Sequence, residues 1–186
     1  MQKIYVFLAT GFEDIEAIAV VDILRRAALP VRTVSVTSQP TVLSSHHVPV
    51  VADDIFEETD FSDAAMLFLP GGLPGATNLE AHDGLAQLIM DHHAAGLPLA
   101  AICAAPMVYG RLGILNGHKA TCYPGFEDDL LGATPTGALV VQDGQFFLGK
   151  GPAAAYELGY AIVAHFCGKE KADEIAAGML YPEVKQ

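Results

Sequence analysis

The chain has 186 residues, of which 52% are hydrophobic and 17% are charged, and its formal net charge is −12. This length fits one domain with a sizeable core, and this composition excludes a disordered or fibrous chain. The 10 Lys and Arg residues are scattered, so the sequence lacks the electrostatic footprint of a protein that binds nucleic acid or an anionic membrane surface.

The first residues form a short apolar run that ends where acidic residues begin at Glu13. This run is unlike a signal peptide and too short to span a bilayer, so we interpret it as a first strand. The three cysteines are an odd number and include no C-x-x-C pair, which argues against a disulfide framework and a structural zinc site. We therefore expect a protein of the reducing cytoplasm with no membrane partner.

Strand and helix patterns alternate along the chain. This order is typical of right-handed βαβ units, which build a parallel sheet with helices on both faces. We predict an α/β fold in a single domain over residues 1–186. In chain order, strands are predicted at 4–8, 31–36, 41–44, 48–52, 66–69, 99–102, 119–122, 138–142 and 145–148. Helices are predicted at 14–28, 85–95, 107–112, 153–166 and 169–179.

The first predicted helix carries an apolar stripe. Ile15, Ile18, Ala19 and Ile23 recur at nearly helical spacing, although Asp22 interrupts them. Such a stripe is typical of the face that a helix buries against a sheet.

The most informative segment is an apolar strand that ends at Cys103 and is followed by Ala104, Ala105 and Pro106. Proline suits the first turn of a helix, so the cysteine lies at a tight strand-to-helix turn that resembles a nucleophile elbow. Free N–H groups and the positive end of the helix dipole favour a thiolate, so we expect a thiol pKa well below the usual value of about 8.5. The alternative is that Cys103 is a small core residue.

In open parallel sheets, functional sites gather beyond the carboxyl ends of the strands. The turns after 4–8, 66–69 and 99–102 are therefore expected to face one crevice. Glu13 and Asp14, which open the first helix, are interpreted as complements of the helix dipole. Glu16 can point back toward the crevice, where burial would raise its pKa and keep it protonated, as a donor to a thiolate or as a general acid/base.

The second of these turns contains Gly71 and Gly72, which permit a positive φ and a close approach of the backbone. Together, the N–H groups of Gly72 and Ala104 could form an oxyanion hole with two donors. The alternative is a plain tight turn. The glycine spacing matches neither a phosphate loop nor a dinucleotide-binding turn.

Several other residues invite functional interpretations. The histidine pairs at 46–47 and 92–93 suggest a metal, but such pairs in a hairpin loop or at an exposed helix end are usually solvated, and we predict no metal site. Cys122 could resolve an oxidised Cys103 as a disulfide, or it could fill the core. Cys167 is interpreted as a packing residue of a helix.

Four motifs follow one another along the chain: Gly11-Phe-Glu-Asp-Ile-Glu16, Leu69-Pro-Gly-Gly72 with Gly75-Ala-Thr-Asn78, Ala100-Ala-Ile-Cys103-Ala-Ala-Pro106, and Lys150-Gly-Pro152. Together they resemble the ThiJ/PfpI superfamily over nearly the full length, in the branch that contains bacterial YajL and the Parkinson-associated protein deglycase. The resemblance implies a single ThiJ/PfpI-type domain, folded as a flavodoxin-like three-layer sandwich with a nucleophile-elbow cysteine. It also implies a homodimer.

The resemblance also implies roles for individual residues. Cys103 would be the reactive cysteine and Glu16 its protonated carboxyl partner. The backbone N–H groups of Gly72, next to Gly71, and of Ala104 would form the oxyanion site. No cofactor is implied.

The chain departs from many relatives at Tyr123, where they have a histidine before a proline on the strand after the cysteine helix. A phenol, with a reference pKa of about 10, cannot shuttle protons near neutrality, although it can donate a hydrogen bond to an oxyanion. The departure therefore favours a mechanism in which the Cys103–Glu16 pair carries out the chemistry. His46 aligns approximately with a basic residue that in relatives approaches the partner subunit's active site, so it is a second candidate pocket residue.

The resemblance implies glyoxalase III or deglycase chemistry on a small reactive carbonyl, an α-oxoaldehyde such as methylglyoxal or one of its adducts. The rival hypothesis is an oxidative-stress sensor or redox-regulated chaperone in which Cys103 is oxidised and Glu16 stabilises the product. Both use the same two residues, and an acidified thiol is both a good nucleophile and easily oxidised. The sequence therefore leaves both open.

Overall fold

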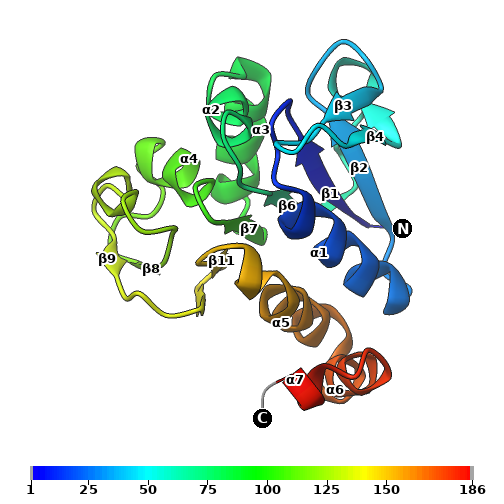
Figure 1. Cartoon of the computed structure of the whole chain (residues 1–186). Coiled ribbons are helices and arrows are strands. Elements are labelled where there is room, and N and C mark those ends of the chain that lie inside the picture. The colour runs from blue at the N-terminus through cyan, green and yellow to red at the C-terminus, as the bar shows by residue number, and fades with distance from the viewer. Residues whose placement is uncertain (1, 185–186) are drawn as a thin grey trace.

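A central sheet forms the middle of the computed structural model, which describes residues 2–184 (Figure 1). Its seven strands lie in the order β10-β11-β7-β6-β1-β2-β5. All neighbours pair in parallel except β10 and β11, which form an antiparallel hairpin. The strands are β1 (Lys3–Leu8), β2 (Val31–Ser35), β5 (Asp54–Ile55), β6 (Ala64–Leu69), β7 (Leu99–Ile102), β10 (Val140–Asp143) and β11 (Phe146–Gly149).

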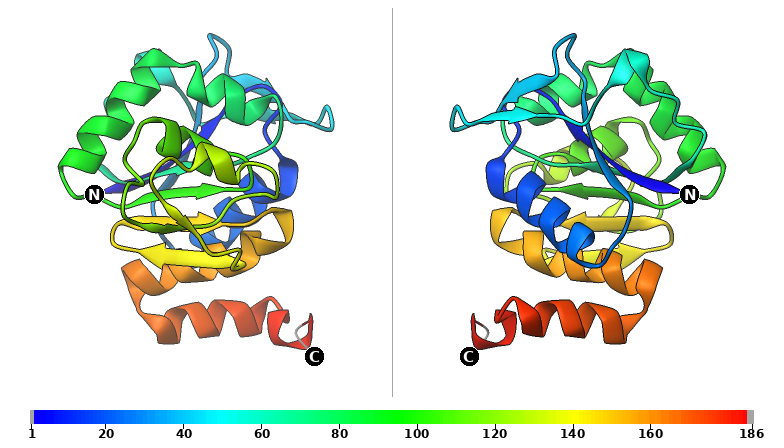
Figure 2. Two further views of the ribbon diagram at one scale, coloured as in Figure 1. Left: turned by 90° about the vertical axis from the view of Figure 1, so that its left-hand side faces the viewer. Right: turned by 90° about the vertical axis from the view of Figure 1, so that its right-hand side faces the viewer.

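Helices cover both faces of this sheet, as Figures 1 and 2 show. On one face lie α1 (Asp14–Arg26), α5 (Ala155–Cys167) and α6 (Lys169–Gly178). On the other lie α2 (Gly75–Glu80), α3 (Asp83–Ala94) and α4 (Pro106–Arg111). The expected flavodoxin-like three-layer sandwich is confirmed.

Alternation along β1 shows how the sequence builds these layers. Ile4, Val6 and Leu8 pack into the hydrophobic cluster that contains α1 and α5. Tyr5 and Phe7 pack into the cluster that contains α3 and α4. All five side chains are apolar or aromatic because a parallel strand between two helical layers is buried on both faces.

Small elements decorate the sandwich. Strands β3 (Thr41–Leu43) and β4 (Pro49–Val51) form the antiparallel hairpin expected after β2, and β8 (Lys119–Ala120) pairs in parallel with β9 (Thr134–Pro135). Short 3-10 turns occur at η1 (Phe56–Glu58), η2 (Glu127–Asp129) and η3 (Pro152–Ala154), and α7 (Tyr181–Val184) follows α6. The strand expected over 119–122 ends two residues early, so Tyr123 lies beyond it.

The stripe expected on the first helix is only partly correct, since Ile23 is buried and Ala19 packs against the core, but Ile15 and Ile18 do not. The buried residues of α1 are Glu16, Ala17, Val20, Val21, Ile23 and Leu24. Ile15 and Ile18 are 50% and 43% exposed. The helix carries apolar residues on two sides, and the spacing alone does not decide which side meets the sheet.

None of the helices in the described part of the chain is both long and apolar enough to cross a membrane.

Candidate functional site

Cys103 occupies the turn between β7 and α4 with a φ of 65°. This left-handed conformation is uncommon for a residue with a side chain, and the surrounding hydrogen bonds hold it in place. The N–H of Cys103 donates to the carbonyl of Gly149 at 2.9 Å, and its carbonyl accepts from the N–H of Tyr123 at 2.8 Å. The strand-turn-helix geometry expected from the sequence is therefore present, with Cys103 9% exposed.

Glu16 lies beside this cysteine and is fully buried. Its Oε2 accepts the N–H of Gly71 at 2.8 Å. Its Oε1 is buried and has no partner with hydrogen-bond geometry among the described residues. A side chain on Gly71 would bring a Cβ within 2.6 Å of both Glu16 Oε2 and Cys103 Cβ, so a glycine is needed for the carboxyl and the thiol to approach each other.

Glu13 positions Glu16 by capping the start of α1. The Glu13 carboxylate accepts the N–H of Glu16 at 2.8 Å, which satisfies one of the free donors at a helix N-terminus. The N–H of Glu13 in turn donates to the carbonyl of Gly71 at 2.9 Å. The cap thus joins the turn after β1 to the turn after β6.

Two backbone N–H groups point at the sulfur of Cys103. They belong to Gly72 and Ala104, and both hydrogen bonds favour the charged form of the sulfur. Gly72 adopts a φ of 85°, and a Cβ there would lie 2.5 Å from the nitrogen of Glu13. The turn therefore needs glycine at this position both for its conformation and for its close packing.

Burial dominates the protonation of the carboxyl and the thiol. It raises the pKa of Glu16 to about 7, although the neighbouring Cys103 thiol and the N–H of Gly71 lower it. Burial, followed by the charge of Glu16, raises the pKa of Cys103 to about 12, although the N–H groups of Gly72 and Ala104 lower it. The raised carboxyl pKa agrees with expectation. The expected low pKa of the thiol is wrong, because burial and a neighbouring carboxylate outweigh the two amides.

Tyr123 is 48% exposed and lies at the edge of the site. It lines a pocket of about 230 Å³, together with Pro124, Leu139 and the segment from Lys150 to Ala154. The sequence indicated a departure at Tyr123 but did not reveal the pocket, because its walls come from three separate segments.

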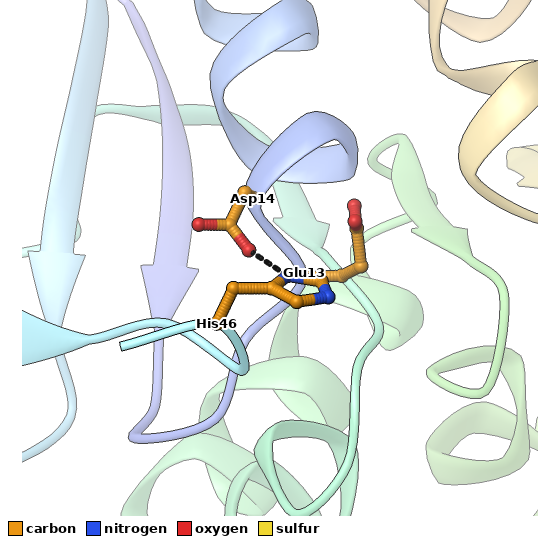
Figure 3. A group of neighbouring side chains, drawn as sticks. All are labelled: Glu13, Asp14 and His46. Atoms are coloured by element: carbon orange, nitrogen blue, oxygen red, sulfur yellow. Dashed lines mark hydrogen bonds and ion pairs between the residues drawn. The ribbon is translucent and has the colours of Figure 1, made fainter. Parts of the chain in front are cut away.

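His46 lies in the loop between β3 and β4. Its Nδ1 pairs with Asp14 Oδ2 at 2.6 Å (Figure 3). This hydrogen bond raises the pKa of His46. The pKa of Asp14 is lowered, because hydrogen bonds to Ser44 and His46 outweigh its partial burial.

Glu13, Asp14 and His46 each offer one possible metal-ligand atom, and the three atoms lie within 4.8 Å of one another. Figure 3 shows the Asp14 carboxylate bonded to the imidazole with Glu13 beside them. Glu13 already caps α1 and Asp14 already pairs with His46. The trio is therefore satisfied by partners within the chain.

The burial of three further residues agrees only in part with expectation. Cys122 is buried in the cluster on the α4 side of the sheet, whereas Cys103 belongs to the cluster on the α1 side. Cys167 is exposed, so its expected packing role is wrong. His92 is 5% exposed and its Nε2 lies 3.0 Å from the carbonyl of Pro98. The expected solvated pair at 92–93 is therefore wrong for its first member, which is buried beside the segment that leads into β7.

Comparison with known proteins gives a consistent picture. Residues 2–165 match the model of the DJ-1/PfpI family. The chain is 35% identical to Protein DJ-1 homolog B of Arabidopsis thaliana over 181 residues, which are 96% of this chain and 41% of that protein. It is 32% identical to Protein dj-1beta of Drosophila melanogaster, over 94% of this chain and 95% of that one. A deglycase of Pyrococcus horikoshii is 29% identical, over 83% and 93% respectively. The chain thus spans less than half of the Arabidopsis relative.

Solved structures of relatives share the architecture. A cysteine-to-alanine mutant of a DJ-1 superfamily protein from Salmonella typhimurium is 32% identical, with a TM-score of 0.92 over 97% of this chain and 98% of that one. The oxidised DJ-1 of Toxoplasma gondii gives the same identity, TM-score and coverage. The backbone fold is therefore shared with these two relatives over nearly the whole chain.

Proposed function

The chain belongs to the DJ-1/PfpI family, and from this premise we propose that it is an enzyme that converts α-oxoaldehydes, or their adducts, into 2-hydroxy acids. The observation that carries the proposal is a buried carboxyl beside a strained cysteine whose sulfur faces two backbone donors. A nucleophile, a base and an oxyanion site are the three parts that such a reaction needs. The relative from Pyrococcus that is named a deglycase supports the same chemistry.

In the first step, the sulfur of Cys103 attacks the aldehyde carbon of the substrate. Glu16, with a pKa of about 7, accepts the thiol proton as the carbon–sulfur bond forms, because a base with a pKa near the working pH is most effective. The negative charge moves to the aldehyde oxygen. The N–H groups of Gly72 and Ala104 stabilise it, at about 3 kcal/mol for each donor.

In the next step, Glu16 passes the proton that it took from the thiol to the oxyanion, which becomes the hydroxyl of a hemithioacetal and leaves Glu16 as a carboxylate. Glu16 removes the proton from the former aldehyde carbon and returns a proton to the neighbouring carbon, through an enediol. The product is a thioester of the 2-hydroxy acid on Cys103. Water then cleaves the thioester and restores the thiol, so that each turnover adds one water to the substrate and requires no cofactor.

Tyr123 and His46 have supporting roles in this proposal. The Tyr123 phenol would donate a hydrogen bond to the bound oxygen, in the place where many relatives have a histidine. His46 would line the crevice of a partner subunit. The free Cys103, Cys122 and Cys167 fit the reducing cytoplasm that we propose as the location.

The test is turnover of methylglyoxal to lactate by wild type, Cys103→Ser and Glu16→Gln. We expect losses on the order of a hundredfold to ten-thousandfold in kcat/KM for each variant. Cys167→Ser serves as the control, since this cysteine is exposed and far along the chain from the elbow, and it should keep the wild-type rate. A wild-type rate no higher than that of Cys103→Ser would refute the enzyme.

A redox sensor or redox-regulated chaperone is the second candidate, because the Toxoplasma relative was solved in an oxidised form. Peroxide would transfer one oxygen to the sulfur of Cys103 and leave as water, and a second transfer would give the sulfinic acid. The unpartnered Oε1 of Glu16 could then donate its proton to an oxygen on sulfur. Mass spectrometry after mild peroxide should find oxidation concentrated at Cys103, and an even spread over Cys122 and Cys167 would contradict the sensor.

We further propose that the protein acts as a homodimer. Ile15, Ile18 and Val48 are 50%, 43% and 49% exposed, and they line one groove with Val50 and Tyr156. Because a two-fold axis presents the same patch on both copies, a self-complementary apolar patch suits a second copy of the chain. Asp14 also lines this groove, which brings the His46 pair to its edge.

A further inference from the structure

An apolar pocket beside the elbow has no role in the reaction described above, apart from the phenol of Tyr123 at its wall. Its volume is about 230 Å³. The lining includes no carboxylate, and its one cation, Lys150, turns its Nζ to the carbonyl of Gly137 at 3.1 Å. The walls are Tyr123, Pro124, Leu139, Lys150, Gly151, Pro152, Ala153 and Ala154.

Hydrogen bonds tie both long walls of this pocket to Cys103 itself. One wall begins at Tyr123, whose N–H donates to the carbonyl of Cys103 at 2.8 Å. The other wall continues from Gly149, whose carbonyl accepts the N–H of Cys103 at 2.9 Å. The two walls also meet each other, since a Cβ on Gly151 would lie 3.2 Å from the Tyr123 ring. The pocket is thus fixed to the backbone of the nucleophile.

We propose that this pocket is a substrate subsite that holds an apolar substituent on the carbon next to the aldehyde, with aryl groups preferred over methyl. The inference rests on the proposed function, in which Cys103 bonds to the aldehyde carbon. A cavity of about 150 Å³ lined by apolar side chains is large enough to bind benzene. The pocket of about 230 Å³ therefore has room for a phenyl ring.

Two large side chains support this assignment through their exposure. Tyr123 and Leu139 are 48% and 46% exposed, on separate segments that face the same space. A flat ring between them would remove apolar surface from water on both of its sides. A methyl group would leave most of that surface exposed, so the pocket distinguishes substrates by the size of this substituent.

The first test compares kcat/KM for phenylglyoxal and methylglyoxal. Leu139→Glu should lower the phenylglyoxal to methylglyoxal ratio about tenfold, because it replaces an apolar wall with a charge. Leu131→Glu is the matched control, since Leu131 is 53% exposed but does not line the pocket, and it should leave the ratio unchanged. Equal ratios in wild type and Leu139→Glu would overturn the subsite.

The second test does not depend on turnover. Phenacyl bromide and bromoacetone are α-bromoketones that differ in a phenyl or a methyl group, and each forms a carbon–sulfur bond as bromide leaves and the thiol proton passes to the buffer. Peptide mass spectrometry gives the ratio of the two labelling rates at Cys103 and at the exposed Cys167. Because both reagents consume the same thiolate at each site, its abundance cancels from the ratio.

The phenacyl preference at Cys103 should exceed that at Cys167 about tenfold, and Leu139→Glu should remove the excess. Equal preferences at the two cysteines would overturn the subsite. An excess at Cys103 without any turnover of methylglyoxal or phenylglyoxal would uphold the pocket and refute the enzyme. The two failures are therefore distinguishable.

Discussion

At the scale of single residues, the site is governed by a buried pair that holds at most one negative charge near neutral pH. The pKa of Glu16 is raised to about 7 and that of Cys103 to about 12, in each case because burial disfavours the anion. A second charge on the pair is costly, since two anions in a low-dielectric site repel each other. Reactivity therefore depends on moving a proton between carboxyl and thiol, and a permanently ionised cysteine is not required.

The raised pKa of Glu16 also makes stability depend on pH. Its folded pKa of about 7 exceeds the reference value of 4.5, so the folded state holds the proton more tightly than the unfolded state. The contribution of Glu16 to stability is therefore complete below pH 4.5, is lost as pH rises through the window from 4.5 to 7, and is absent above it. At pH 8 the buried charge costs about 3 kcal/mol.

Glu16→Gln should restore this free energy, because the amide keeps the acceptor for Gly71 without the charge. Urea unfolding should show a gain of about 3 kcal/mol at pH 8 and less than about 1 kcal/mol at pH 5. The exposed Glu58 supplies the control, since Glu58→Gln should change little at either pH. A gain from Glu16→Gln that is equal at both pH values would show that charge burial is not its cause.

At the scale of elements, the site depends on two turns that pack backbone against backbone. The N–H of Gly75 donates to the carbonyl of Gly11 at 3.2 Å, and Asn78 Nδ2 donates to the carbonyl of Thr10 at 2.8 Å. A Cβ on Gly11 would lie 2.5 Å from Pro74 Cδ. The turn after β1 leads into α1, which carries Glu16, and the turn after β6 holds Gly72, so this packing sets the distance between the carboxyl and the N–H of Gly72.

Gly11→Ala should therefore cost stability for two reasons, a φ of 88° and the overlap with Pro74. Together they amount to about 3 kcal/mol, of which the backbone conformation accounts for about 1 kcal/mol. Gly113→Ala isolates that smaller share, because Gly113 has a φ of 75° with nothing within 4 Å of the added Cβ. Equal losses for the two variants in denaturant unfolding would show that the close packing of the turns does not matter.

The elements that the sequence predicts well are those with a strong local signal. The strand before Cys103 is predicted because it consists of four apolar residues. The helix after Cys103 is predicted because a proline stands at its start. The two-residue strands β5 and β9 and the short helices α2 and α7 were not predicted, since so few residues carry no periodicity. In α2, the run of glycine and proline before Asn78 indicates a turn, and its tertiary packing makes it helical.

Within the site, the sequence predicted which residues meet and the direction of the Glu16 pKa shift, but not the direction of the Cys103 pKa shift. Cys103, Glu16 and Gly72 lie together because parallel strands end at one edge of the sheet. The pKa of Cys103 was predicted in the wrong direction, because burial at 9% exposure comes from segments distant in sequence. The same holds for the pocket beside Tyr123, whose walls meet only after folding.

At the scale of the whole molecule, α1 has two apolar sides, and only one of them is buried. One side, including Val20 and Leu24, packs on the sheet, and the other presents Ile15 and Ile18 to solvent. Two copies of a chain with a net charge of −12 repel each other at long range, and salt screens this repulsion. A dimer through the exposed side therefore has to gain its stability from apolar contact, and salt should strengthen it.

Ile18→Glu places a charge in the centre of the proposed dimer face, once in each copy. If two isoleucine contacts are lost across a two-fold axis, the dimer should weaken at least about a hundredfold, before any repulsion between the new carboxylates. Light scattering should then give the monomer mass of 19.6 kDa for Ile18→Glu and twice that mass for the wild type.

Met90→Glu is the matched control. Met90 is also a half-exposed apolar residue on a helix, at 38% exposure, but it lies on the opposite face of the sheet. A dimer that survives Ile18→Glu, or one that Met90→Glu disrupts equally, would place the contact elsewhere. High salt screens the repulsion between the two negatively charged copies. If the wild type still has a mass of 19.6 kDa at high salt, the proposed dimer through the exposed side of α1 is refuted.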